Sequence, residues 1–520
     1  MTDRKHNWHT PEFDRWRRLV PLAVCLVVIL TLVLIPLRII GYGYLPLDDT
    51  LRQAAQAVSG RSWSEILVLN PACQIDPEFG WNLLLAKIHV VTGVEAETLV
   101  IFSVAGLFIL TGLAAVSWLR RPEVWLAVLT LSMVWERLPF QFLLGRSYLI
   151  TLAGLLTVLL LWRRFGGAAP KVWMGAVVAG AVAASVFFHG AWYLWALPVS
   201  AFLLAGQFRW GGMVGGGTAA GVVLGCAFTG HPLAYPVQAV KLSLLCVGGH
   251  GAQRAMASEL QPLSGDSAAV FLLVGLALLR LLAGLKAMAF WRDPVFWLVC
   301  LGWTLGLFGS RFWIDWGWPA LLVLVAGDLE LFLQTQMAAN TFRRLALAGG
   351  LALIAFLALT TDIDGHWTAN LTDRFLSEAD DPGVRGWLPE KGGIFYTTDS
   401  RLFYRTFYRN PRGDWRYLPD FEPTWMSKED FDVYQSVLWN HGALQAYEPW
   451  IKKMRLPDRL AVGGAPGGAP GIPQLEWKFS VSGVWLGRLP GQHLDGAPAD
   501  VRATPNAAVG TNAVTSGKTN

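Results

Sequence analysis

The chain has 520 residues, of which 53% are hydrophobic and only 15% are charged, with 26 Trp and a mean hydropathy of +0.41. This composition excludes an ordinary soluble enzyme and a disordered protein, and it is typical of a protein with many membrane-spanning helices. The net charge of +5 reports mainly membrane orientation, because basic residues gather at the cytoplasmic ends of membrane helices. We therefore expect no nucleic-acid partner.

The first predicted element is a membrane span at about 19–40. It follows the basic stretch RWRR at 15–18, is too long for the apolar core of a signal peptide, and precedes no small-residue cleavage site. We expect a retained span, with the N-terminus in the cytoplasm and the loop at 41–98 outside.

Two adjacent carboxylates, Asp48 and Asp49, lie near the start of this loop, and Thr50 opens the helical pattern TLRQAAQAV, which we expect to lie along the membrane surface. One carboxylate can cap that helix, since an anionic side chain there satisfies free N–H groups and suits the helix dipole. Asp49 is the better placed for this role. A cap needs no second, repelling carboxylate, whereas binding a divalent ion or activating a hydroxyl does. We expect Asp48 to act on substrate, and capping alone is the alternative.

Further along the loop, Glu78 precedes the segment GWNLLLAKIHVVTGV. The acidic pair after the first span, a helix leading to a Gly and a Trp, and this second acid together resemble the first extracytoplasmic loop of the GT-C superfamily. These are membrane glycosyltransferases that use polyprenyl-phosphate-linked sugars. In the aminoarabinose and protein-mannosyl transferase pattern, Asp48 and Asp49 match the acidic pair, and Glu78, or less closely Asp76, matches the second acid. FGWNLL replaces the Lys-Pro-Pro-Leu segment, so that Lys has no counterpart.

The resemblance implies a GT-C-like fold and an inverting hexosyl- or pentosyltransferase. It implies that Asp48 and Asp49 are catalytic, that Glu78 binds substrate, and that Asp48, Asp49 and Glu78 hold a divalent ion, Mg or Mn. The implied partners are a polyprenyl-phosphate-linked sugar donor, a glycan, lipid or protein acceptor, and membrane lipid.

Ten further apolar segments of about 16–22 residues are predicted spans. The segments lie near 99–118, 123–143, 147–162, 172–188, 192–206, 211–228, 268–285, 294–309, 317–333 and 344–360. Basic residues occupy alternate connections, which the positive-inside rule places in the cytoplasm. We expect an all-α polytopic membrane domain at 1–360 with about eleven transmembrane helices. The odd count places residues after about 361 outside, and we expect the bacterial inner membrane as the location.

Short connections on the same predicted outer side carry Arg146, His189, Arg311 and Asp315. Each connection is only a few residues long, so these side chains are expected at the depth of a lipid phosphate. A guanidinium group donates two N–H bonds at once to a phosphate. We expect all four residues to bind substrate. The alternative is anchoring at the membrane interface, with Asp315 simply pairing with Arg311.

From residue 361 the composition becomes aromatic and charged, which predicts a small extracytoplasmic α+β domain at 361–490. We expect a strand in GIFYTT at 393–398, a helix around 427–446, and further strands after the Gly/Pro linker at 461–474. The Arg and aromatic side chains near residue 400 could hold an acceptor sugar, although such residues more often form a domain core. The tail at 491–520 is expected to be disordered.

Five Cys are few for this length. Cys25, Cys226 and Cys300 lie in apolar runs, where they act as small hydrophobic side chains. Cys73 and Cys246 lie in loops predicted to be outside, where an oxidising compartment would allow a disulfide between them. No Cys spacing suggests zinc.

We therefore expect an integral membrane glycosyltransferase that moves a sugar from a polyprenyl-phosphate donor to an acceptor on the outer face. A polysaccharide ligase or polymerase is the first alternative, and it would use the outer Arg and His residues without the acidic pair. A lipid or oligosaccharide transporter is the second, and it would need polar groups near mid-membrane. A binding protein that the spans only anchor is the third.

Overall fold

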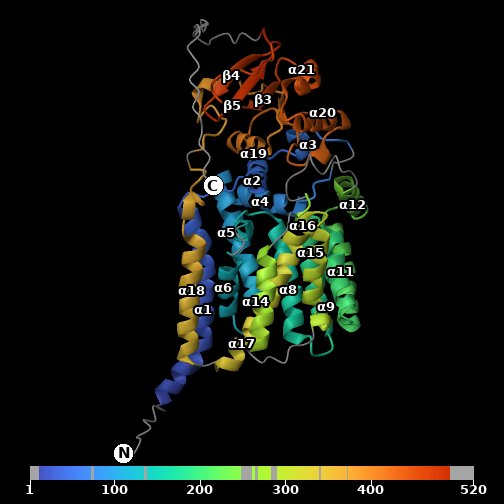
Figure 1. Ribbon diagram of the computed structural model, residues 1–520. Helices are drawn as coiled ribbons and strands as arrows, with labels where there is room; N and C mark the ends of the chain where they lie inside the picture. The colour runs from blue at the N-terminus through green and yellow to red at the C-terminus, as the bar shows by residue number, and fades with distance from the viewer. Residues whose placement is uncertain are drawn as a thin grey trace, which may run out of the picture.

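The computed structural model describes residues 11–71, 75–133, 137–247, 261–263, 267–282, 290–338, 341–371 and 373–491. A long helical bundle carries a small C-terminal domain at one end (Figure 1). We call this the domain end of the bundle, and the other the opposite end. Cys73 and the tail beyond Gly491 lie outside the described residues, as does the side chain of Cys246, so the predicted disulfide and disordered tail fall there.

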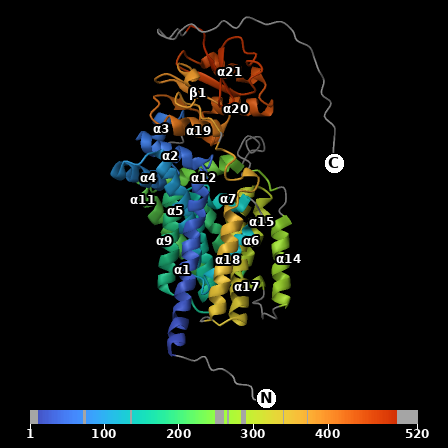
Figure 2. The same cartoon turned by 90° about the vertical axis from the view of Figure 1, so that its left-hand side faces the viewer.

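Seven helices in the described part of the chain are long and apolar enough to cross a membrane, which is the property of a membrane protein. These segments are Arg18–Gly41 in α1 (Pro11–Gly41), α5 (Ala96–Val116), α8 (Tyr148–Phe165), α9 (Val172–His189), α11 (Phe208–Phe228), Ser310–Gln336 through α16 (Ser310–Phe312), η4 (Trp313–Gly317) and α17 (Trp318–Gln336), and α18 (Phe342–Thr360). Helices α1 and α18 run side by side along one edge (Figure 2).

The other four predicted spans coincide with shorter apolar helices, so the predicted number of about eleven is not established. They are α6 (Glu123–Ser132), η1 with α10 (Trp192–Leu204), α14 (Ser267–Leu282) and α15 (Pro294–Gly306). The predicted span at 123–143 is divided, because α7 (Arg137–Phe142) is a separate helix after residues 134–136, which are not described. The remaining bundle helices are α2 (Asp49–Ser59), α3 (Trp63–Ile66), α4 (Phe79–Thr92) and α12 (Ala234–Val247).

A stripe of glycines lets α9 and α11 pack at close range. Gly217, Gly221 and Gly225 recur every fourth residue on α11 and face α9. A Cβ atom on Gly221 or Gly225 would lie 2.6 Å from the Cβ of Val182 or Val186, respectively. Small residues at such crossings allow the close backbone approach that drives helix association in membranes.

Buried ion pairs join neighbouring helices at the opposite end of the bundle. Each links a guanidinium to a carboxylate that is at most 5% exposed. Removing one partner would leave an uncompensated buried charge, which costs about 3–5 kcal/mol. The pairs are Arg344–Glu123 at 2.7 Å, Arg163–Asp293 at 2.7 Å, and Arg280–Asp328, whose second bond is 2.9 Å.

The C-terminal domain contains a five-stranded sheet in the order β2-β1-β3-β5-β4. Strand β1 runs parallel to β2 and β3, and β5 runs antiparallel to β3 and β4. The predicted strand at 393–398 and the strands after the linker are present, as is the predicted helix near 427–446. The elements are β1 (Ile394–Tyr396), α19 (Ser400–Arg409), β2 (Arg416–Tyr417), α20 (Lys428–Trp439), α21 (Glu448–Lys453), β3 (Arg459–Gly463), β4 (Glu476–Ser480) and β5 (Val484–Arg488).

Helix α19 was not predicted, although its sequence contains a helix signal. Asp399 caps the helix by accepting a hydrogen bond from the Arg401 amide at 3.0 Å. Leu402, Phe403 and Phe407 then fall on one buried face at helical spacing. This amphipathic helix lies between the sheet and α2 (Figure 1), so it brings the domain against the acidic loop.

Candidate active site

The acidic pair begins α2, but its capping residue is Asp48 rather than Asp49 as predicted. Asp48 has extended backbone angles, φ −155° and ψ −173°, and its Oδ1 accepts a hydrogen bond from the Asp49 amide at 2.7 Å. Asp49 is already the first helical residue, where its charge suits the positive end of the helix dipole. The prediction that Asp49 caps the helix is therefore wrong, because Asp48 does so.

Helix α2 is buried between the bundle and the C-terminal domain, which the sequence did not predict, and its place along the membrane surface stays a prediction. Eight of its eleven residues are buried, including the polar Thr50, Arg52 and Gln53. It packs against α19 of the C-terminal domain and against α4 and α5 of the bundle. Polar side chains in such a position need partners, because an unpaired buried polar group is costly.

The turn before α8 docks on α2 and brings a guanidinium to the acidic pair. The Thr50 hydroxyl donates to the carbonyl of Leu144. The next residue, Gly145, has φ +66°, and a Cβ there would lie 3.0 Å from the Thr50 hydroxyl oxygen. The turn therefore places Arg146 directly over Asp48, with Nε 2.7 Å from Oδ2.

Two guanidinium groups alternate with three carboxylates across the site. Arg146 Nε also lies 3.8 Å from Asp49 Oδ2. On the other side, Arg52 donates from Nε to Asp49 Oδ1 at 3.0 Å and from Nη2 to Glu78 Oε2 at 2.7 Å. We call the chain Asp48–Arg146–Asp49–Arg52–Glu78 the carboxylate–guanidinium ladder.

Glu78 is the last residue of the ladder and is buried, with 8% of its surface exposed. Besides Arg52, Gln53 Nε2 donates to Oε2 and Ser147 Oγ donates to Oε1, each at 2.8 Å. Both oxygens are thus occupied by protein donors. Asp76 holds the loop next to it, since its oxygens accept from the Glu78 amide at 2.9 Å and from Asn82 Nδ2 at 2.7 Å.

The environment moves the two aspartate pKa values in opposite directions. Burial raises the pKa of Asp48 to about 6, with Arg146 acting against this and the Asp49 charge adding to it. Burial acts on Asp49 as well, but Arg52 and Arg146 outweigh it and hold the pKa of Asp49 below its usual range. Adjacent carboxylates with separated pKa values are common in active sites.

Asp49 also has the more accessible oxygen. Its side chain is 20% exposed, against 9% for Asp48. Oδ1 of Asp49 accepts from Arg52 and from the Tyr404 hydroxyl, which lies 2.9 Å away on α19. Oδ2 has only the 3.8 Å approach of Arg146 among its described contacts. This oxygen is therefore the best placed to meet a substrate hydroxyl.

A second polar group surrounds His189 at the domain end of α9. Arg311 Nη2 lies 3.4 Å from His189 Nε2, and His189 Nδ1 lies 3.2 Å from Thr151 Oγ1. Because a guanidinium can only donate, Nε2 must accept, so the proton of a neutral imidazole is assigned to Nδ1, which donates to Thr151. Asp315 accepts from Arg311 Nε at 3.0 Å, one helical turn further on.

The ladder and the His189 group adjoin one another. Tyr148, two residues after Arg146, has its ring 6.2 Å from that of His189. The charges of Asp49 and Arg146 are also close enough to interact electrostatically with the imidazole of His189. The structure thus gathers all seven predicted site residues at the domain end, with Asp48, Asp49, Glu78 and Arg146 in the ladder and the other three beside it.

Sequence reasoning missed Arg52 and Tyr404. The contact of Arg52 with Asp49 could have been predicted, because a basic residue three positions after an acidic one on a helix lies on the same face. Tyr404 lies in the aromatic stretch near residue 400 that the sequence offered for an acceptor sugar, but its contact with Asp49, 355 residues away, had no signal.

The predicted metal ligands Asp48, Asp49 and Glu78 do not fit a divalent ion as they are arranged. Mg²⁺ and similar ions need several oxygens converging on one point, whereas guanidinium groups lie between these carboxylates. Among the described residues, no group of three or more His, Cys, Asp or Glu is suited to hold a metal.

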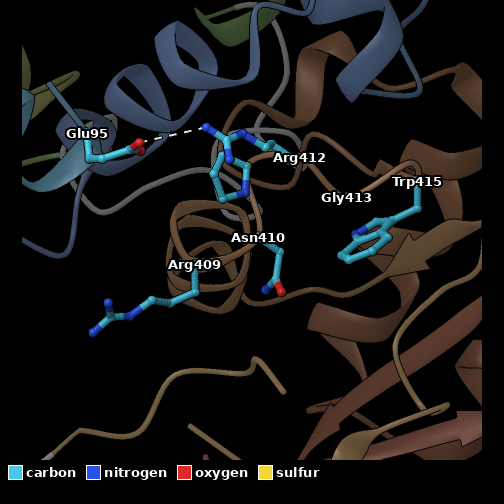
Figure 3. A pocket seen from close by; sticks show the side chains of 7 residues that line it. Glu95, Arg409, Asn410, Arg412, Gly413 and Trp415 are labelled. Atoms are coloured by element: carbon cyan, nitrogen blue, oxygen red, sulfur yellow. Dashed lines mark ion pairs between the residues drawn. The ribbon is translucent and has the colours of Figure 1, made fainter. Parts of the chain in front are cut away.

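A hollow of about 420 Å³ opens where the end of α19 meets the start of α5 (Figure 3). Arg409 and Asn410 from the end of α19, Arg412 and Trp415 from the turn that follows, and Glu95 from the bundle line it. Arg412 and Glu95 form an exposed ion pair at 3.7 Å across it. Aromatic, guanidinium and amide groups together are suited to a polar ring such as a sugar.

No protein-family model matches this chain, and no curated protein is similar to it. The resemblance to the GT-C superfamily therefore rests on the residues of the first loop.

Proposed function

We propose that this protein is a membrane glycosyltransferase that moves a sugar from a polyprenyl-phosphate donor to a glycan, lipid or protein acceptor. The observation that carries the proposal is the carboxylate–guanidinium ladder, with the His189 group next to it, at the end of an apolar helical bundle. The basic turns of the sequence favour an orientation with this end outside the cytoplasm. A lipid-linked donor would reach the site from the membrane, and an acceptor from the C-terminal domain.

The hydroxyl oxygen of the acceptor attacks the anomeric carbon of the donor sugar. Asp49 Oδ2 takes the proton of that hydroxyl as the attack proceeds. The bond between that carbon and the phosphate oxygen breaks, and polyprenyl phosphate leaves with one more negative charge. Arg146 and Arg311 lie where they can compensate this charge. Asp49 is assigned as the proton acceptor because of its geometry, which decides this role before the pKa does. Asp48, whose pKa burial raises to about 6, lies beside Asp49, whose charge adds to that rise.

A transporter is the rival from another class. Alternating access requires the opposite end of the bundle to open, and there buried ion pairs tie α6 to α18, α8 to the start of α15, and α14 to α17. The ladder residues also lie at one end instead of near mid-membrane. These features favour a one-sided active site. The acidic pair in the ladder likewise disfavours a ligase or polymerase that uses only Arg and His.

The test is sugar transfer by the purified full chain in lipid nanodiscs, with a panel of polyprenyl-phosphate hexoses, pentoses and aminosugars. Asp49→Asn keeps the size of the side chain but removes the base, so we expect transfer to fall about a hundredfold or more. Asp432→Asn changes an exposed carboxylate far from the ladder in sequence and serves as the matched control. Wild-type rates in both Asp48→Asn and Asp49→Asn would refute the proposal.

A further inference from the structure

The first outer loop is joined to the C-terminal domain through the edge of its sheet. Leu67 forms a parallel bridge with Tyr417 of β2, and the Val68 amide donates to the Tyr417 carbonyl at 2.9 Å. Two residues later, the Asn70 amide donates to the Trp425 carbonyl at 2.7 Å. The loop that carries the ladder therefore extends the sheet instead of merely touching the domain.

Aromatic side chains of the domain reach the ladder itself. Tyr404 on α19 is 8% exposed, and its hydroxyl donates to Asp49 Oδ1 at 2.9 Å. Burial and the nearby Asp49 charge raise the pKa of Tyr404 well above its usual value, so its hydroxyl keeps its proton and remains a donor. Phe421 of the domain packs on Arg52, with 4.6 Å between the guanidinium carbon and the ring centre. Trp63, which belongs to the first outer loop, has its ring centre 5.3 Å from the same carbon.

We propose that the C-terminal domain completes the active site and that Tyr404 is a positioning residue for Asp49. This inference rests on the proposed glycosyltransferase function. Tyr404 and Arg52 both donate to Oδ1 of Asp49, and this fixes the carboxylate with Oδ2 toward the acceptor hydroxyl.

The physical reason lies in the freedom of an aspartate side chain. The terminal torsion of Asp is broad and nearly two-fold, so one donor leaves the carboxylate free to tilt and to exchange its oxygens. A second donor on the same oxygen, from a different direction, removes that freedom. A hydrogen bond to an ionised group is also stronger than one between neutral groups. Loss of the Tyr404 hydroxyl should therefore affect the orientation of the base more than substrate binding.

The decisive variant is Tyr404→Phe, which keeps the ring against Phe403 and Phe421, whose centres lie 5.7 and 5.9 Å away. We expect kcat to fall about tenfold, as misplacement of a catalytic group does, with KM for donor and acceptor unchanged within about twofold. Tyr408→Phe is the matched control, since Tyr408 lies one turn further along the same helix and is 7% exposed. It should leave kcat unchanged.

A double-substitution cycle separates positioning from general damage to the fold. In an Asp49→Asn background, Tyr404→Phe should change the residual rate by less than about twofold, because the hydroxyl acts through that carboxylate. An equal, tenfold loss in both backgrounds would overturn the inference. So would a wild-type kcat in Tyr404→Phe.

Hydrogen exchange of the α2 amides gives a readout that does not depend on activity. Exchange within Asp49–Ser59 should rise several-fold in Tyr404→Phe and stay unchanged in Tyr408→Phe, because Tyr404 ties α2 to α19. If wild-type protein transfers no sugar, the proposed function fails, while raised exchange would still support the docking. If wild-type protein is active but Tyr404→Phe changes neither exchange nor kcat, only the present inference fails.

Discussion

Replacing Arg52 should destabilise the protein in a way that depends on pH. Its guanidinium is 5% exposed and bonds both Asp49 and Glu78. Arg52→Gln leaves two buried carboxylates without their shared cation, and removing one partner of a buried pair costs about 3–5 kcal/mol. Arg52→Lys keeps the charge, but one ammonium cannot reproduce the fork, so we expect the loss of one charged hydrogen bond, about 1.5–3 kcal/mol.

The pH dependence follows from the sign of the pKa changes. In the wild type, the lowered pKa of Asp49 stabilises the folded state above the unfolded value of 3.8, so this contribution is complete at both pH 5 and pH 8. Without Arg52, burial, which raises the pKa of Asp49, is opposed by one cation fewer, so we expect the folded pKa of Asp49 to rise above its unfolded value. The folded state then binds protons more readily than the unfolded state, and stability falls as pH rises through the folded pKa of Asp49. The deficit of Arg52→Gln should be larger at pH 8 than at pH 5.

The assay is thermal unfolding of purified protein in nanodiscs at pH 5 and pH 8. For a chain of this length, the expected loss corresponds to a midpoint lower by about 3–5 °C at pH 8. Arg209→Gln is the control, because Arg209 is exposed at the start of α11, and it should change the midpoint by less than about 1 °C. A deficit that is equal at both pH values, or larger at pH 5, would refute the reasoning about the two carboxylates.

Further outcomes follow from the same geometry. The rate of transfer should fall as pH drops through about 6, because a protonated Asp48 no longer holds Arg146, which is proposed to compensate the charge of the leaving phosphate, and a flat profile between pH 5 and pH 8 would show that the charge of Asp48 has no part in transfer. Chelation with EDTA should leave transfer within about twofold of its starting rate, because guanidinium groups occupy the positions between the carboxylates; stoichiometric Mn²⁺ binding that restores lost activity would contradict this. Trp415→Ala should raise the acceptor KM about three- to tenfold with little change in kcat, as expected for a lost aromatic contact, and an altered donor KM instead would assign the hollow to the donor. A Cys introduced at Ser427 should react with an impermeant thiol reagent added outside intact cells, and one at Gly167 should not; the reverse labelling would invert the proposed orientation.

The sequence predicted helices well wherever an apolar run decides the structure. Every predicted span coincides with at least one helix, because in lipid a chain must satisfy its backbone hydrogen bonds internally. The length of each helix is harder to predict from the sequence. Segments such as Pro294–Gly306 are apolar but end early, since η3 (Phe290–Arg292) and Asp293 cap one end and a turn around Gly309 ends the other.

The candidate site was predictable only in part. Composition and loop position indicated Asp48, Asp49, Arg146 and Arg311, because charged residues at membrane helix ends are few. Their pairing was not predictable, since Arg146 lies 98 residues from Asp48 and the contact depends on how the bundle packs. For the same reason the bond between Arg52 and Glu78 was not predictable, and the predicted contact of Glu78 with substrate stays a prediction.

The joining of the first outer loop to the C-terminal sheet sets an order of events during synthesis. Leu67 is made 350 residues before its bridge partner Tyr417, and at about 5–20 residues per second the interval is roughly 20–70 s. During that time α2 lacks the helix that covers it and Asp49 lacks one of its donors. The newly inserted bundle should therefore remain inactive until the last domain has folded, so a truncated chain in the membrane would carry all three acidic residues of the ladder and still transfer no sugar efficiently.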